Sequence, residues 1–253
     1  MPRFAANIGF LFTEYPFLDR FAAAAAAGFR AVEYMSPYDY RPEVMAGLLR
    51  QHGLRQVLIN SPAGDWAAGE RGTAALAGRT AEFRDGIDRA IAHAKATATP
   101  ALHVMAGIAG PEARALYVEN VAWAAERLER AGIDCLIEPI NRRDIPGYFL
   151  ADFGLALAVI EEIDAPNLKL QYDVYHRQIL HGDVIRSLEA LLPRIGHVQI
   201  AGVPDRGEPD AGELNYAHVF AALDSLGYAG WVGCEYRPRG RTADGLGWMA
   251  KLA

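Results

Sequence analysis

Short apolar runs alternate along the chain with longer segments in which apolar residues recur at helical spacing. The short runs are rich in β-branched and aromatic residues, as strands are, and the longer ones are rich in Ala, Leu, Arg and Glu, as helices are. The pattern predicts strands over residues 4–10, 31–35, 56–60, 101–106, 133–140, 168–172, 195–200 and 231–235. It predicts helices over residues 16–27, 42–52, 80–96, 111–131, 150–163, 179–192, 217–226 and 242–252.

This order of elements indicates an α/β fold of the (β/α)8 TIM-barrel type. Eight strand–helix units within 253 residues are the usual size of such a barrel. A doubly wound sheet more often has fewer strands and a glycine-rich first turn, and the chain contains neither GxGxxG nor GxxxxGK[ST]. No linker, low-complexity tract or step in composition interrupts the pattern, so we predict one domain over residues 1–253.

Composition narrows the class of partner. The formal net charge is −6, which argues against a nucleic-acid-binding protein because phosphate neutralisation needs a basic face. There is neither a signal-peptide pattern nor an apolar run long enough for a bilayer, so we expect a cytoplasmic protein without a membrane partner. Cys135 and Cys234 lie in apolar runs and are expected to be reduced and buried.

Four late strands each point an acidic or amide side chain inward near the carboxyl end. Alternate residues of a barrel strand point inward, and residues at the carboxyl ends of the strands face the active-site mouth. Counting parity along these strands places four side chains inward at that end: Glu138, Asp173, Gln199 and Glu235. Three carboxylates in one cavity are costly without a cation, so we predict one divalent metal ion there. All-oxygen ligation favours Mg²⁺ or Mn²⁺ over Zn²⁺.

Long stretches of the chain resemble hydroxypyruvate isomerases of the xylose-isomerase-like TIM-barrel superfamily. The segments that carry the resemblance include LIEPIN, QYDVYH, HVQIAGVPDRGEPDAGELNY, WVGCEYRP and NSPAGDWAAGERG. The 2-oxo-tetronate isomerases share the same overall sequence pattern. Three segments resemble that group equally well: MPRFAAN, HVMAG and HVQIAGVPDR. The other segments favour hydroxypyruvate as the substrate, and a four-carbon oxo-tetronate is the alternative.

The resemblance implies a metal held by Glu138, Asp173, Gln199 and Glu235, with the two glutamates as the acid/base pair. An α-hydroxy carbonyl can chelate such an ion, which then stabilises the enediolate formed when a carbon-bound proton leaves. Proton exchange at the neighbouring carbon completes the shift of the carbonyl, which would convert hydroxypyruvate to tartronate semialdehyde. The expected partner is therefore a small hydroxy-keto acid. Homo-oligomers are common among such barrels, but the sequence indicates no interface.

Three further residues are predicted to bind the substrate. His176 follows Asp173 just beyond its strand, where its ring could bond a substrate oxygen. Arg206 offers a bidentate match to the substrate carboxylate, although a surface pair with Asp205 or Glu208 is an equal alternative. Glu70 lies in the long 61–80 segment, whose composition would suit a lid.

Other polar residues have simpler interpretations. Asp144 could reach the mouth as an acidic substrate ligand, as in related sugar epimerases, but a solvated loop charge is the favoured interpretation. His103 and His197 point inward deeper in their strands and are expected to be hydrogen-bonded core residues.

Two other classes of function remain as alternatives. A phosphodiesterase of the endonuclease IV type shares the barrel, but it uses several histidines and zinc ions on a basic face, where this chain has Gln199 and a negative charge. A binding protein that has lost its chemistry would tolerate loss of Glu138 or Glu235, and both are present.

Overall fold

A computed structural model describes residues 2–252 of the chain. Its eight strands form a closed barrel in chain order, which confirms the predicted fold. The strands are β1 (Arg3–Asn7), β2 (Ala31–Tyr34), β3 (Arg55–Asn60), β4 (Ala101–His103), β5 (Asp134–Ile137), β6 (Leu168–Asp173), β7 (Ile195–Ile200) and β8 (Trp231–Cys234). The α-helices are α1 (Arg20–Ala26), α2 (Pro42–His52), α3 (Thr80–Thr97), α4 (Arg114–Glu129), α5 (Phe153–Ile163), α6 (Val174–Leu180), α7 (Val184–Leu191), α8 (Tyr216–Ser225) and α9 (Trp248–Leu252).

Contacts within the chain group into two compact units. The first unit comprises the residues up to Tyr34, Gly47–Val57 and the residues from Tyr172 onward. The second unit comprises Met35–Ala46 and Leu58–Gln171. Asp173, Gln199 and Glu235 therefore belong to the first unit, and Glu138 belongs to the second.

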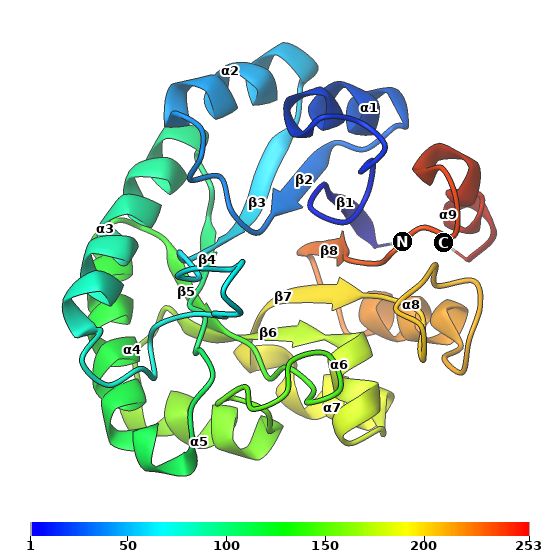
Figure 1. Ribbon diagram of the computed structural model, residues 1–253. Helices are drawn as coiled ribbons and strands as arrows, with labels where there is room; N and C mark the ends of the chain where they lie inside the picture. The colour runs from blue at the N-terminus through cyan, green and yellow to red at the C-terminus, as the bar shows by residue number, and fades with distance from the viewer. Residues whose placement is uncertain (1, 253) are drawn as a thin grey trace. The chain divides into compact units, whose positions relative to one another are not determined.

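The first unit is built on parallel strands around β1 (Figure 1). Strand β1 pairs with β2, where Asn7 lies opposite Glu33, and with β8, where Ala5 lies opposite Gly233. Strand β8 also pairs with β7, in a register that sets Gln199 opposite Gly233. Two-residue alternation then sends these polar residues to one face of the strands and the apolar residues to the other.

In the second unit, β4 pairs with β3 and β5, and β5 pairs with β6, all in parallel. Helices α3, α4 and α5 lie along the outer side of these strands (Figure 1). Aromatic side chains pack between neighbouring helices of this layer. Phe83 of α3, for example, meets Trp123 of α4 edge-on, with 6.4 Å between the ring centroids. The strands of this unit are thus held between neighbouring strands and a helical layer.

Several predicted elements end earlier or divide. The first strand ends at Asn7 instead of residue 10, because Phe10 and Leu11 donate their backbone N–H groups to the Asn7 carbonyl in a turn. The predicted strands at 101–106 and 133–140 are also shorter, as β4 and β5. The predicted 242–252 helix is a 3-10 turn (Thr242–Gly245) followed by α9.

The predicted helix over residues 179–192 is shorter in the structure, as α7, and its first residues belong instead to the end of α6 and to a break. Helix α6 starts directly after β6, and α7 starts after a break. Gly182 and Asp183 form the break with positive φ angles of 61° and 49°, a backbone conformation that cannot continue a right-handed helix.

Both cysteines are free and buried, as predicted. None of the helices within residues 2–252 is long and apolar enough to span a bilayer.

Candidate active site

Asp173 is the last residue of β6 and the N-cap of α6. Its Oδ1 accepts a hydrogen bond from the backbone N–H of Tyr175 at 2.8 Å, and its side chain is buried. The strand thus sets the position of the Asp173 carboxylate, and the start of the helix holds its orientation. The first N–H groups of a helix need acceptors from outside the helix, and this carboxylate serves as one. Its predicted position at the carboxyl end of the strand is confirmed.

Gln199 and Glu235 lie together in the first unit. The Gln199 Nε2 group donates to Glu235 Oε2 at 2.5 Å, and both side chains are buried. Gln199 lies within β7, and Glu235 follows the last residue of β8. Parity counting along these two strands therefore placed both side chains on the correct face.

Arg206 is buried against the acidic residues and not on the surface. Its Nη2 group makes an ion pair with Glu235 Oε1 and lies 3.8 Å from Asp173 Oδ2. The alternative of a surface pair with Glu208 is wrong, because Glu208 pairs with Arg239. The guanidinium also lies 4.9 Å from the ring centroid of Phe10, a distance at which cation–π attraction helps to hold a buried charge.

Burial dominates the electrostatics of Glu235. The pKa of this carboxyl is raised to about 8, first of all by its loss of hydration on burial. Arg206 opposes this rise, and the charges of Asp173 and Glu33 add to it. A cation placed beside Glu235 would favour its ionised form.

His176 lies just beyond β6, as predicted, in the first turn of α6. Its side chain is buried, and Nε2 lies 3.6 Å from Asp173 Oδ2. The helix starts at Val174 because Asp173 caps it, and this brings the ring back over the carboxylate three residues earlier.

The sequence analysis missed Glu33 and Asn7. Glu33 Oε1 accepts hydrogen bonds from Gln199 Nε2 at 2.7 Å and from Asn7 Nδ2 at 3.1 Å. Asn7 Nδ2 also donates to Glu235 Oε2 at 2.8 Å. A glutamate inside the apolar run AVEYM was the signal available, since an acidic residue in a buried strand needs partners.

His197 is a hydrogen-bonded core residue, as predicted. Its Nε2 lies 2.6 Å from Glu33 Oε2, and both side chains are buried. The imidazole therefore joins the same polar cluster from deeper in β7.

In the second unit, Glu138 follows β5 and is buried. His103 Nδ1 lies 3.5 Å from Glu138 Oε2. Burial lowers the pKa of His103 to about 3, so this imidazole is neutral at physiological pH.

Glu70 is held by its own loop. Its carboxylate accepts two hydrogen bonds from Arg79, at 2.7 and 3.2 Å, and one from the Asp65 backbone N–H at 2.6 Å. Trp66, which is 47% exposed, stacks on Arg71 with 3.7 Å between the guanidinium carbon and the ring centroid. The substrate-binding role of Glu70 stays a prediction, and its contacts within the 61–80 segment are structural.

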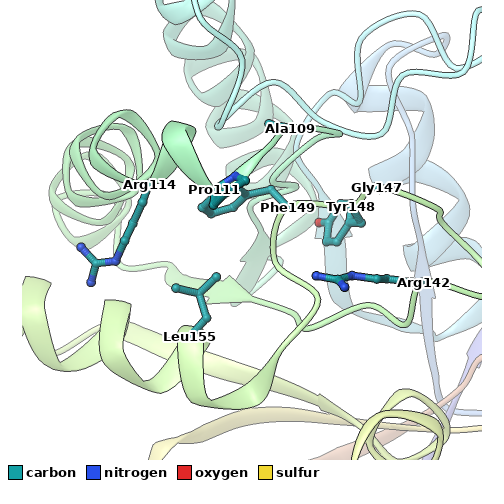
Figure 2. Close-up of a pocket in the computed structure, with 8 residues that line it drawn as sticks. All are labelled: Ala109, Pro111, Arg114, Arg142, Gly147, Tyr148, Phe149 and Leu155. Atoms are coloured by element: carbon teal, nitrogen blue, oxygen red, sulfur yellow. The ribbon is translucent and has the colours of Figure 1, made fainter.

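Figure 2 shows a cavity of about 520 Å³ in the second unit, between the segments that follow β4 and β5. Among the described residues its lining consists of Ala109, Pro111, Arg114, Arg142, Gly147, Tyr148, Phe149 and Leu155. Glu138 is not in this lining, so the cavity is separate from the predicted ligand. Asp144, from the same segment, is half-buried, and its backbone N–H is bonded to Asn141 Oδ1 at 2.9 Å.

The donor set fits a hard divalent cation. Asp173, Gln199 and Glu235 offer buried carboxylate and amide oxygens, the ligands that Mg²⁺ and Mn²⁺ prefer. Within the first unit, the Asp173 carboxylate and the His176 ring lie close enough to serve as ligands of one ion.

Comparisons with known proteins agree with the fold. A family model described as "Xylose isomerase-like TIM barrel" matches residues 21–252. The chain is 53% identical to the 2-oxo-tetronate isomerase of Cupriavidus necator and 46% identical to the hydroxypyruvate isomerase of Escherichia coli, each over 98% of both chains. A crystal structure from Brucella melitensis, described as an AP endonuclease of family 2, superposes with a TM-score of 0.97 at 50% identity over 99% of both chains.

Proposed function

Because the chain belongs to the xylose isomerase-like TIM barrel family, within its group of hydroxypyruvate and 2-oxo-tetronate isomerases, we propose that it isomerises a short hydroxy-keto acid. One divalent ion, Mg²⁺ or Mn²⁺, is held by Glu138, Asp173, Gln199 and Glu235. The observation that carries this proposal is the buried pairing of Gln199 with Glu235 at the ends of β7 and β8. Carboxyl ends of barrel strands carry the catalytic residues in enzymes of this fold.

The ion would act as a Lewis acid on the two adjacent oxygens of an α-hydroxy carbonyl. Glu138 and Glu235 act as the acid/base pair, which removes a proton from the hydroxyl-bearing carbon and returns a proton to the former carbonyl carbon, while the hydroxyl proton passes to the former carbonyl oxygen. The burial of both carboxylates supports this role, since proton transfer between fixed groups is efficient where water is excluded.

Arg206 binds the carboxylate of the substrate in this proposal. Its guanidinium lies against Glu235 and Asp173, so one end of the substrate would be fixed close to the reacting carbons. His176, beside Asp173, donates a hydrogen bond to a substrate oxygen. These two contacts orient the small acid relative to the acid/base pair.

The comparisons change the order of the two candidate substrates. The sequence motifs favoured hydroxypyruvate, whereas identity is higher to the Cupriavidus necator 2-oxo-tetronate isomerase than to the Escherichia coli hydroxypyruvate isomerase. We therefore place the four-carbon 2-oxo-tetronate first and hydroxypyruvate second. Both are small acids, and neither a nucleic acid nor a membrane is a partner in this proposal.

Steady-state turnover of the two acids tests the assignment. Purified chain supplied with Mn²⁺ should isomerise both, with the higher kcat/KM for 2-oxo-tetronate. A higher value for hydroxypyruvate would reverse the order of substrates, and no turnover of either acid would refute the proposed function.

A further inference from the structure

Glu33 is a buried carboxylate on β2 that the proposed chemistry does not use directly. Its two oxygens accept hydrogen bonds from Asn7, His197 and Gln199. Burying a carboxylate costs free energy that such hydrogen bonds must offset. The cluster around Glu33 is therefore a defined network that reaches the proposed metal ligands.

Gln199 shows what this network does. Its amide nitrogen carries two hydrogens, and that nitrogen faces both Glu33 Oε1, at 2.7 Å, and Glu235 Oε2, at 2.5 Å. With the nitrogen committed to two acceptors, only Oε1 of this amide can ligate a cation. If the Gln199 amide were rotated by 180°, its oxygen would face the carboxylates of Glu33 and Glu235, which repel it.

Glu235 cannot hold this orientation alone, because it is itself a proposed ligand whose oxygens would be drawn to the ion. Asn7 Nδ2 bridges the same two carboxylates as Gln199, with 3.1 Å to Glu33 Oε1 and 2.8 Å to Glu235 Oε2. Glu33 is thus the common acceptor of both amides.

We propose that Glu33 is a positioning residue, which directs the Gln199 side-chain oxygen towards the metal ion by fixing the amide nitrogen on its opposite side. This role rests on the proposed function, because it requires Gln199 to be a metal ligand. Glu33 does not touch the substrate or the ion in this account. It acts through Gln199.

Gly233 provides independent support. A Cβ atom at this position of β8 would overlap the Glu33 carboxylate, so the strand leaves the space that the carboxylate occupies. Gly233 lies opposite both Gln199 on β7 and Ala5 on β1. Glycine at this point of the sheet thus permits Glu33 to reach across β8 towards the strand that carries Gln199.

Calorimetric titration of the metal-free protein with Mn²⁺ tests this role without relying on activity. Glu33→Gln should weaken Mn²⁺ binding 10- to 100-fold, roughly the range found when a residue that orients a metal ligand is changed. Gly233→Ala should weaken it in the same direction by displacing the carboxylate, and it serves if Glu33→Gln does not fold. In a Gln199→Ala background, Glu33→Gln should cause no further loss beyond about twofold, because the residue through which it acts is already gone.

Asn167→Ala is the matched control for a merely structural effect. Asn167 is a buried amide whose Nδ2 donates only to the carbonyls of Ala125 and Ile133, so its loss should lower the melting temperature and leave Mn²⁺ affinity unchanged. Wild-type affinity in Glu33→Gln, or an equal loss with and without Gln199, would overturn the role of Glu33 alone. Absence of Mn²⁺ binding by the unaltered chain would overturn the proposed metal site as well.

Discussion

Individual residues of the site are governed by the cost of burying charge. Glu235 is buried beside Asp173 and Glu33, and it makes an ion pair with Arg206. A divalent ion would add positive charge to this group, and the same carboxylates would then serve as ligands and as proton carriers.

Removing the charge of Glu235 tests its proposed role. Glu235→Gln keeps the size of the side chain and a hydrogen-bonding group, so the fold should persist while kcat falls about 10²- to 10⁴-fold, the usual contribution of a general acid or base. Stopped-time assays with both candidate acids measure the loss. Glu189→Gln, which changes an exposed carboxylate in α7, is the control expected to keep normal turnover. A Glu235→Gln enzyme with near-normal kcat would assign the proton transfer elsewhere.

Residue patterns in the sequence singled out Glu138, Asp173, Gln199 and Glu235 because each lies at or near the carboxyl end of a strand with a regular alternation. Glu33 was not predicted as a site residue because it lies inside a strand, where the alternation of apolar and polar residues does not single out an acidic side chain. The buried position of Arg206 also escaped, since a positive φ of 55° and partners distant in sequence set its direction.

At the scale of elements, the junction of β6 and α6 has two roles: it starts a helix, and it positions two proposed site residues, Asp173 and His176. Most helices were predictable from their apolar period, and α2 begins and ends where the pattern indicated. The α6 helix was missed because no loop separates it from its strand. Asp173 replaces such a loop by capping the helix directly, and this also places His176 beside the carboxylate.

Substitutions of Asp173 should separate its capping role from its charge. Asp173→Asn retains an oxygen for the Tyr175 N–H, so the melting temperature in chelator should change little while Mn²⁺ binding weakens. Asp173→Ala should lose the cap as well, at about 1 kcal/mol, or roughly 2–4 °C in melting temperature. Thermal unfolding followed by circular dichroism distinguishes the two. Equal melting temperatures for both variants would mean that the cap is not important for the helix.

The 61–80 segment is ordered by contacts of its own. The Arg79 pair joins the end of the segment to Glu70 in its middle, and Arg71 stacks on Trp66. Ala75 also donates its backbone N–H to the Ala106 carbonyl at 2.8 Å. Loops of this length on a compact fold commonly carry function, and these contacts hold this one in a defined shape.

Paired substitutions can show whether Glu70 acts on the loop or on the substrate. Glu70→Gln and Arg79→Met each remove the ion pair, so both should increase limited proteolysis within the segment and should raise KM by similar factors. Proteolysis timed by gel electrophoresis and steady-state KM values provide the comparison. A rise in KM confined to Glu70→Gln would instead mean that the carboxylate itself contacts the substrate.

At the scale of the whole molecule, charge and ligand type argue against a role on DNA. The Brucella melitensis structure is described as an AP endonuclease, yet the present chain has a net charge of −6. A negatively charged protein gains little from the counterion release that drives DNA binding. Family membership and the amide at position 199 both favour a small acid as the ligand.

Incubation with a duplex that contains one abasic site tests this exclusion. We expect no strand cleavage with Mg²⁺, Mn²⁺ or Zn²⁺, and no retardation of the duplex on a native gel at physiological salt. The same preparation must isomerise a hydroxy-keto acid, which shows that it is active. Specific incision at the abasic site would restore the endonuclease as a candidate function.

The central claim is that Glu138, Asp173, Gln199 and Glu235 hold a single divalent ion. Mn²⁺ titration of the unaltered chain and of Glu138→Gln tests it most directly, because this substitution removes the charge of one proposed ligand and keeps the size of its side chain. We predict one Mn²⁺ per chain and at least a tenfold weaker affinity in Glu138→Gln. Failure of the unaltered chain to bind Mn²⁺, or equal affinity in the variant, would contradict the claim.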